Sequence, residues 1–132
     1  MIALDTNILV RFLVRDDEKQ AQAVYSRFKQ AESAREVLFV PLPVVLETIW
    51  VLESAYDLAR PDILDALDGL KGLSILKFEK PAVLQSLIVE GKKTSCDLSD
   101  LLIALASHSC GCSGALTFDK KASKLSFFKL LG

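Results

Sequence analysis

The sequence has few histidines and cysteines, the residues that most often bind zinc. Its only histidine is His108, and its three cysteines, Cys96, Cys110 and Cys112, lack the paired C-x-x-C spacing of a zinc site. We expect the thiols to be reduced and packed, and His108 to pack near the end of a helix. A reaction catalysed by this chain must therefore use other side chains.

The sequence also lacks a long apolar segment. The longest run, Leu38–Leu46, contains Pro41 and Pro43 and is far shorter than the roughly 20 residues that a membrane helix needs. The first residues, Met1–Asp5, have neither the basic segment nor the cleavage site of a signal peptide, so they read as a first strand. We therefore expect a cytoplasmic protein that does not enter a membrane.

An excess of positive charge is missing as well. The net charge of −1 argues against a protein that holds nucleic acid by bulk charge, because such binding normally uses clustered Lys and Arg. A metal-assisted nuclease is not excluded. If four of the 17 acids bound metal ions, 13 acids would remain against 16 Lys and Arg, and a polyanion could approach the site.

The residues that are present predict one globular domain spanning 1–132, since 51% are hydrophobic and 25% are charged. Apolar spacing, capping residues and prolines predict strands at 2–4, 37–40, 73–78, 115–118 and 127–131, and helices at 8–14, 16–29, 44–56, 61–70, 81–91 and 98–109. This alternation predicts an α/β fold, a three-layer α/β/α sandwich with a mostly parallel sheet of four or five strands.

Glu47 is a single carboxylate inside the apolar stretch Val44–Leu52, in a helix that is apolar on every side in its first half. An unpaired buried carboxylate is costly, so we expect Glu47 to meet a cation or a metal ion. The alternative is a glutamate on a narrow exposed stripe.

Asp5 and Asp119 each follow a predicted strand directly. Ligands of open parallel sheets bind beyond the carboxyl ends of the strands, so these two acids are expected to meet at one edge. Each could instead only cap the helix or turn that follows.

Asp97 and Asp100 have the spacing of a helix N-cap and the third helical residue, so a plain capping pair is one interpretation. Asp100 is the better ligand candidate, because the first turn of a helix favours an anion. Asp97 could both cap the helix and orient Asp100.

Several carboxylates in one cleft repel each other, and Mg²⁺ or Mn²⁺ with oxygen ligands relieves that cost. Such ions can activate water for attack on a phosphodiester, so no nucleophilic side chain is required. The acids therefore predict a Mg²⁺ site, in which Mn²⁺ substitutes, and phosphodiester hydrolysis. One metal ion or two are both compatible with this pattern.

The same residues lie in motifs that resemble PIN-domain nucleases, most closely the VapC toxins of type II toxin–antitoxin systems. The motifs are Leu4-Asp5-Thr6-Asn7, Pro43–Leu52 around Glu47, Asp97-Leu98-Ser99-Asp100 and Thr117-Phe118-Asp119-Lys120, and the resemblance spans the chain. It implies a PIN-like fold, and a metal-binding, catalytic quartet of Asp5, Glu47, Asp100 and Asp119. Thr6, Asn7 and Asp97 are then supporting residues.

The resemblance further implies an endoribonuclease whose substrate is RNA, such as tRNA or rRNA, together with a cognate antitoxin and a homodimer. The helix 44–56, with Trp50 and Tyr56, could form part of an antitoxin groove, or simply belong to the core. Near the acids, Lys92, Lys93, Lys120 and Lys121 are candidate contacts to RNA phosphates.

Other functions fit less well. A response-regulator receiver needs an acidic pair directly after the first strand, whereas Thr6 and Asn7 follow Asp5, and a haloacid-dehalogenase phosphatase needs a second Asp where Asn7 stands. The stronger alternative is a non-catalytic PIN-like binding module, with structural acids, that acts in a toxin–antitoxin repressor complex.

Overall fold

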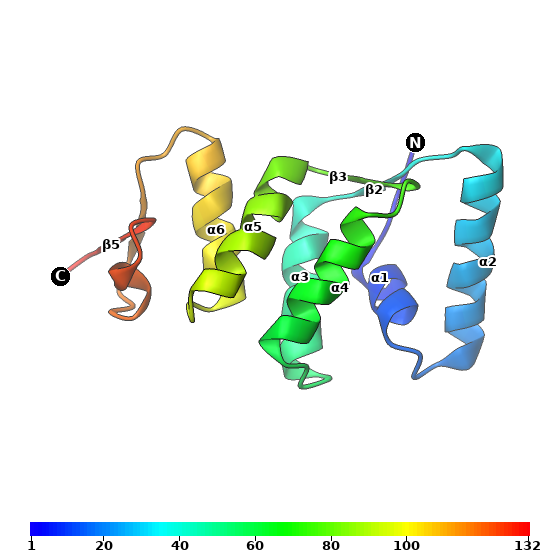
Figure 1. Cartoon of the computed structure of the whole chain (residues 1–132), viewed down its shortest axis with the longest axis horizontal. Coiled ribbons are helices and arrows are strands. Elements are labelled where there is room, and N and C mark those ends of the chain that lie inside the picture. Colours follow the sequence, from blue (N-terminus) through cyan, green and yellow to red (C-terminus); the bar gives the residue numbers. More distant parts are fainter. The chain divides into compact units, whose positions relative to one another are not determined.

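Strands and helices alternate along the chain as the sequence predicts. The structure, a computed structural model, describes residues 1–132. It contains two compact units, residues 1–81 (unit 1) and residues 82–132 (unit 2). The elements of unit 1 are β1 (Ile2–Ala3), α1 (Thr6–Leu13), α2 (Glu18–Ala34), β2 (Leu38–Val40), α3 (Leu42–Ser54), α4 (Arg60–Lys71) and β3 (Leu76–Phe78) (Figure 1). Those of unit 2 are α5 (Pro81–Lys93), α6 (Leu98–Ser109), β4 (Ala115–Thr117), the 3₁₀ turn η1 (Ala122–Lys124) and β5 (Phe128–Leu130).

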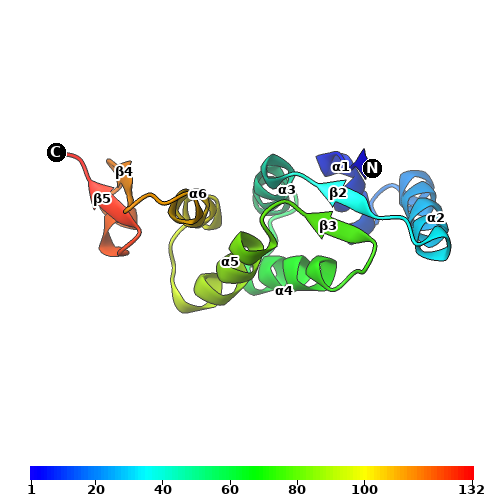
Figure 2. The ribbon, with the colours of Figure 1, turned by 90° about the horizontal axis from the view of Figure 1, so that it is seen from above.

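The three strands of unit 1 form a parallel sheet in the order β1-β2-β3. Ile2 pairs with Leu38, which in turn pairs with Leu76, and β2 and β3 run side by side in Figure 2. The ladder continues past β1, where the Leu4 amide donates to the Phe39 carbonyl over 2.8 Å. The carboxyl ends of the strands therefore lead into Asp5, Pro41 and Glu79.

The helices of unit 1 bury apolar residues at helical spacing. In α4 these are Ile63, Leu64, Leu67 and Leu70, and in α3 they are Val45, Ile49 and Leu52, beside the buried Thr48. Proline marks the start of both helices, since its fixed φ suits the first turn, where its missing N–H leaves no bond unmade. α1 packs against both α2 and α3, and Leu9 and Val10 are buried in that contact.

Unit 2 consists of two helices and a two-stranded parallel sheet. The apolar residues Val83, Leu84, Leu87 and Ile88 of α5 and Leu98, Leu101, Leu102 and Leu105 of α6 are buried. β4 pairs with β5 from Ala115↔Phe128 to Thr117↔Leu130, as Figure 2 shows. α6 ends at Ser109, and the positive φ of 92° at Gly111 allows the amides of Gly111 and Cys112 to bond back to His108 and Ser107.

The α/β class and the parallel strands are confirmed, with a three-stranded parallel sheet in unit 1 and a two-stranded parallel sheet in unit 2. The bounds of two elements differ from the sequence prediction. α2 extends to Ala34 rather than Lys29, because Gln30–Ala34 contains no helix breaker, and β3 begins at Leu76, after the turn that ends α4. None of the helices is long and apolar enough to cross a membrane.

Candidate active site

Asp5 lies at the junction of β1 and α1, as predicted. It is exposed, and its Oδ1 accepts a hydrogen bond of 2.7 Å from the Thr6 amide. Thr6 is buried at the first position of α1, whereas Asn7 is exposed. The cap uses one carboxylate oxygen, so Asp5 can cap α1 and still offer its second oxygen to a ligand.

Glu47 is exposed on α3, so the prediction that this carboxylate is buried was wrong. The first half of α3 is not buried on every side, because Pro43, Glu47 and Trp50 form an exposed stripe opposite Val45 and Ile49. The exposed-stripe alternative is correct. Glu47 therefore needs no buried cation to be stable, and its candidacy as a ligand depends on its motif alone.

The start of α3 is fixed by Glu79, an acid that sequence reasoning missed. Glu79 follows β3 as Asp5 follows β1, and its Oε1 accepts a 2.7 Å hydrogen bond from the Leu42 amide at the first residue of α3. Its own amide donates to the Val40 carbonyl over 2.9 Å. An acid directly after a strand was the available signal, and here it marks a residue that positions the Glu47 helix.

Asp97 and Asp100 occupy the start of α6. The Oδ1 of Asp97 accepts a 3.1 Å hydrogen bond from the Asp100 amide, so Asp97 is the N-cap that the sequence suggested. Asp100 lies in the first turn, where the helix dipole favours a negative charge. The hydrogen bond to Asp97 involves the amide of Asp100 and not its carboxylate.

Asp119 lies just after β4 and also forms a local cap. Its Oδ1 accepts hydrogen bonds from the amides of Lys121 and Ala122, at 2.9 and 3.3 Å, and its own amide donates to the Thr117 hydroxyl. Asp5 and Asp119 thus both form the local caps that the sequence suggested. In each case one oxygen makes the cap, which leaves the other available.

Three acids of unit 2 interact electrostatically. α6 and β4 are joined by the short turn 110–114 and run in opposite directions, which brings the first turn of α6 and the end of β4 to the same end of the unit. Partial burial and the negative charges of Asp97 and Asp119 raise the pKa of Asp100. A nearby cation would therefore favour the ionisation of Asp100.

The donor chemistry fits a hard divalent cation, since carboxylate oxygens are the ligands that Mg²⁺ and Mn²⁺ prefer. However, no group of three or more His, Cys, Asp or Glu side chains comes close enough together in the structure to hold a metal ion. Asp5 and Glu47 belong to unit 1, and Asp97, Asp100 and Asp119 to unit 2. Neither unit by itself contains a complete metal site.

The candidate RNA-contacting lysines are all exposed. Lys92 and Lys93 form the last turn of α5, and Lys120 and Lys121 directly follow Asp119. Because their ammonium groups are accessible within a few residues of the acids of unit 2, they are placed suitably for contacts to phosphate.

Several expectations about packing need correction. Cys96 is buried, but Cys110 and Cys112 are exposed in the turn that ends α6, so only one thiol is packed as predicted. His108 is exposed, although its ring lies 6.5 Å from that of Phe127. On α3 Trp50 is 62% exposed and does not belong to the core.

Comparison with known proteins decides the family. Residues 2–128 match the PIN domain family. The chain belongs to this family. It is also 27% identical to a protein named VapC ribonuclease from Aquifex aeolicus (strain VF5), over 128 residues that cover 96% of this chain and 93% of the relative. The resemblance to VapC-like PIN domains is thereby confirmed.

Proposed function

We propose that this PIN domain is a Mg²⁺- or Mn²⁺-dependent endoribonuclease and the toxin of a VapBC-type toxin–antitoxin pair. The observation that carries the proposal is the group of Asp97, Asp100 and Asp119 in a member of the PIN domain family, where partial burial and the charges of Asp97 and Asp119 raise the pKa of Asp100. A divalent cation favours the charged form of a carboxyl whose pKa is raised in this way. The name of the Aquifex relative supports RNA as the substrate.

In this proposal Asp5, Glu47, Asp100 and Asp119 together bind the metal. When bound, divalent cations supply an activated water and neutralise charge on the departing oxygen. The Thr6 amide and the Asp97 cap hold Asp5 and the first turn of α6 in place. Glu79 holds the start of α3 and so fixes the position of the helix that carries Glu47.

We further propose that the chain forms one PIN-like nuclease domain, residues 1–132, a three-layer sandwich in which the strands of both units form one mostly parallel sheet. Each unit supports this by exposing apolar residues on a strand: Ile2 of β1 is 56% exposed, and Leu116 of β4 is 70% exposed. An edge strand that exposes apolar side chains is normally covered or paired.

Partners follow from the same proposal. The cytoplasmic protein would bind a cognate antitoxin and form a homodimer, and tRNA and rRNA are the RNA classes to test first. Trp50, exposed on α3 beside Glu47, is the candidate antitoxin contact, because an exposed large aromatic is typical of protein interfaces. Tyr56 is a second candidate, and its hydroxyl donates to Asp16 and accepts from Arg11 within unit 1, which holds its ring in place.

The test is cleavage of a labelled single-stranded RNA by purified protein. We expect cleavage with Mg²⁺ or Mn²⁺, and loss of cleavage with EDTA or in the variant Asp5→Asn. Asp62→Asn, which removes an exposed acid from the first turn of α4, is the matched control and should cleave normally.

Two results would contradict the proposal. Undiminished cleavage in EDTA and in Asp5→Asn would exclude the metal mechanism. Failure to cleave any RNA, with binding to an antitoxin retained, would support the alternative, a non-catalytic PIN-like module of a repressor complex.

A further inference from the structure

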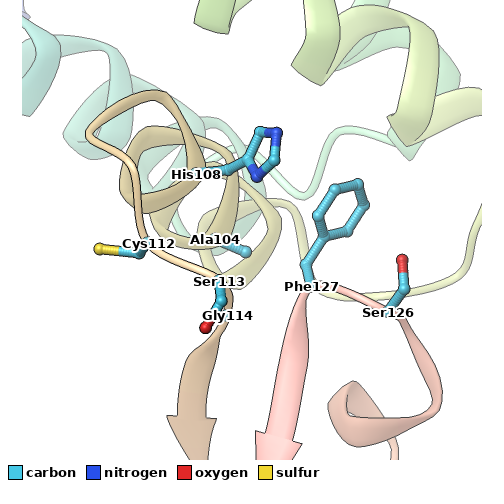
Figure 3. Close-up of a pocket in the computed structure, with 7 residues that line it drawn as sticks. All are labelled: Ala104, His108, Cys112, Ser113, Gly114, Ser126 and Phe127. Atoms are coloured by element: carbon cyan, nitrogen blue, oxygen red, sulfur yellow. The ribbon is translucent and has the colours of Figure 1, made fainter.

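Unit 2 contains a cavity of about 140 Å³ that none of the candidate acids lines (Figure 3). It lies at the end of α6 that carries His108, whereas Asp100 lies in the first turn of the same helix. The residues that line it include Ala104, His108, Ser113, Gly114, Ser126 and Phe127. No sequence pattern singles out this set, because serines and glycines in turns are normally only turn formers.

Two aromatic rings line the cavity, and its volume leaves room for one ring of a ligand. In Figure 3 the rings of His108 and Phe127 lie at its mouth, with centroids 6.5 Å apart and planes inclined by 70°. Its volume is close to the roughly 150 Å³ of a protein cavity that holds one benzene molecule. A single six-membered ring therefore matches this volume more closely than a fused double ring does.

Polar groups and a fixed positive charge surround this space. The Nζ of Lys129 donates a 3.2 Å hydrogen bond to the Ser113 hydroxyl. The stem of Lys129 lies over Gly114, where a Cβ would come within 3.1 Å of the lysine Cε. The absence of a side chain at Gly114 thus lets Lys129 lie at the rim, where its ammonium can meet an anion.

We propose that this cavity binds one pyrimidine nucleotide of the single-stranded RNA substrate. The base contacts the rings of His108 and Phe127, its polar edge bonds to the hydroxyls of Ser113 and Ser126, and its phosphate meets Lys129. Proteins recognise single-stranded RNA in this way, by aromatic contact and bonds to base edges. The proposal rests on the proposed ribonuclease function and adds a specificity pocket to it.

The distance between the two sites suits a strand that occupies both. Eight residues of α6 separate Asp100 from His108, which corresponds to about 12 Å at 1.5 Å per residue. A single strand cut at the acids can extend over that length within a few nucleotides. The cavity would therefore read a base near the cleavage site and not the bond that is cut.

The experiment uses His108 as the probe, because it is the only histidine and gives one set of imidazole signals in NMR spectra. The full-length protein in EDTA is titrated with CMP, UMP, AMP and GMP. We expect saturable shifts of the His108 signals with CMP or UMP, and at least fivefold weaker binding of both purine nucleotides. Inorganic phosphate, as the control for an anion effect, should not reproduce the shift.

Three variants locate the binding. Ala104→Leu fills the cavity and should abolish the shift, and Phe127→Leu, which keeps an apolar side chain but removes the ring, should weaken binding about tenfold. Lys129→Gln should weaken binding of CMP or UMP but leave binding of cytidine or uridine unchanged, because the lysine ammonium bonds only to the phosphate. Phe127→Leu and Lys129→Gln keep the test decisive if Ala104→Leu does not fold.

The inference is wrong if no nucleotide shifts His108, if purines bind as well as pyrimidines, or if phosphate alone gives the same shift. It is also wrong if binding survives in the folded Ala104→Leu variant. These outcomes are separate from those of the proposed function, since metal-dependent RNA cleavage can persist while the His108 signals stay unchanged.

Discussion

The two units differ in charge and in how their charges are used. Unit 1 contains all five arginines, and Arg11, Arg15 and Arg27 form ion pairs with Asp16, Glu18 and Glu36. Unit 2 has no arginine, and its six lysines stand against only four acids, of which three are Asp97, Asp100 and Asp119. Three of the five arginines of unit 1 are thus paired within the unit, whereas unit 2 has more lysines than acids.

The strands of the two units differ in how far their apolar side chains are exposed. β2 and β3 bury Leu38, Val40 and Phe78, whereas Leu116 of β4 and Phe118 just beyond it are 70% and 78% exposed. Exposed large apolar groups on a strand mark a surface that contacts something else. The comparison indicates that β2 and β3 are covered within unit 1, whereas β4 of unit 2 exposes apolar side chains at which another surface can associate.

The largest effect is expected from acids taken from both units. Asp5→Asn and Asp100→Asn should each lower the rate of RNA cleavage by about a hundredfold or more, and the double variant should be little worse than either. The reason is that residues acting as one unit do not contribute additively. Initial rates with Mn²⁺ give the measurement. If only the Asp100 variant is impaired, the two units do not share a site.

A core substitution tests whether the units unfold together. Leu101→Ala in α6 removes a fully buried side chain and should cost about 2–5 kcal/mol of folding free energy. The only tryptophan, Trp50, lies in unit 1 and reports denaturant unfolding there by fluorescence. In one cooperative domain, Leu101→Ala lowers the midpoint seen by Trp50. Leu116→Ala, at an exposed position, is the control, and an unchanged midpoint for Leu101→Ala would show independent unfolding.

The lysines of unit 2 should matter for RNA binding more than those of unit 1. Replacing Lys120 and Lys121 by Gln should weaken binding to RNA in EDTA and reduce the slope of log K against log salt by about 0.7 for each phosphate that is no longer neutralised. Lys19→Gln with Lys29→Gln, two exposed changes on α2, form the matched control. Equal slopes of log K against log salt for the two double variants would show that Lys120 and Lys121 do not contact RNA phosphates.

The smallest effect concerns the pH dependence of stability. Because the pKa of Asp100 is raised by burial, Asp97 and Asp119, the folded chain holds this proton more tightly than the unfolded chain does. In EDTA, stability should therefore fall as the pH rises from the ordinary carboxyl pKa of about 3.9 to the raised value, and remain lowered above it. Asp100→Asn should remove this loss and raise the melting temperature slightly at pH 7, but not below about pH 3.5. Thermal melts across this range would contradict the assignment if both proteins shared one profile.

The order of the elements could be read from the sequence because local rules govern it. Pro43, Pro61 and Pro81 stand in the first turns of α3, α4 and α5, where helix starts were predicted. The end of α2 was missed because Arg35 ends the helix in a left-handed conformation, which its residue type does not indicate. Local signals mark helix starts better than helix ends in this chain.

Burial within an element was harder to predict. The apolar neighbours of Glu47 suggested a buried carboxylate, yet packing selects one face of α3 and leaves Glu47 and Trp50 exposed. Likewise, the roles of Glu79 and Lys129 depend on bonds to residues distant in the chain, Leu42 and Ser113. Such pairings have no sequence spacing from which they could be inferred.

The sequence by itself determined the family, the alternation of strands and helices and the positions of the acids, because capping, turn and periodicity rules act over a few residues. Only the tertiary structure decided that Asp97 and Asp119 act on the ionisation of Asp100, that Glu47 is exposed, and that the last turn of α6 borders a cavity. Electrostatic coupling and cavities depend on distances in space, which arise only when elements remote in the chain pack together.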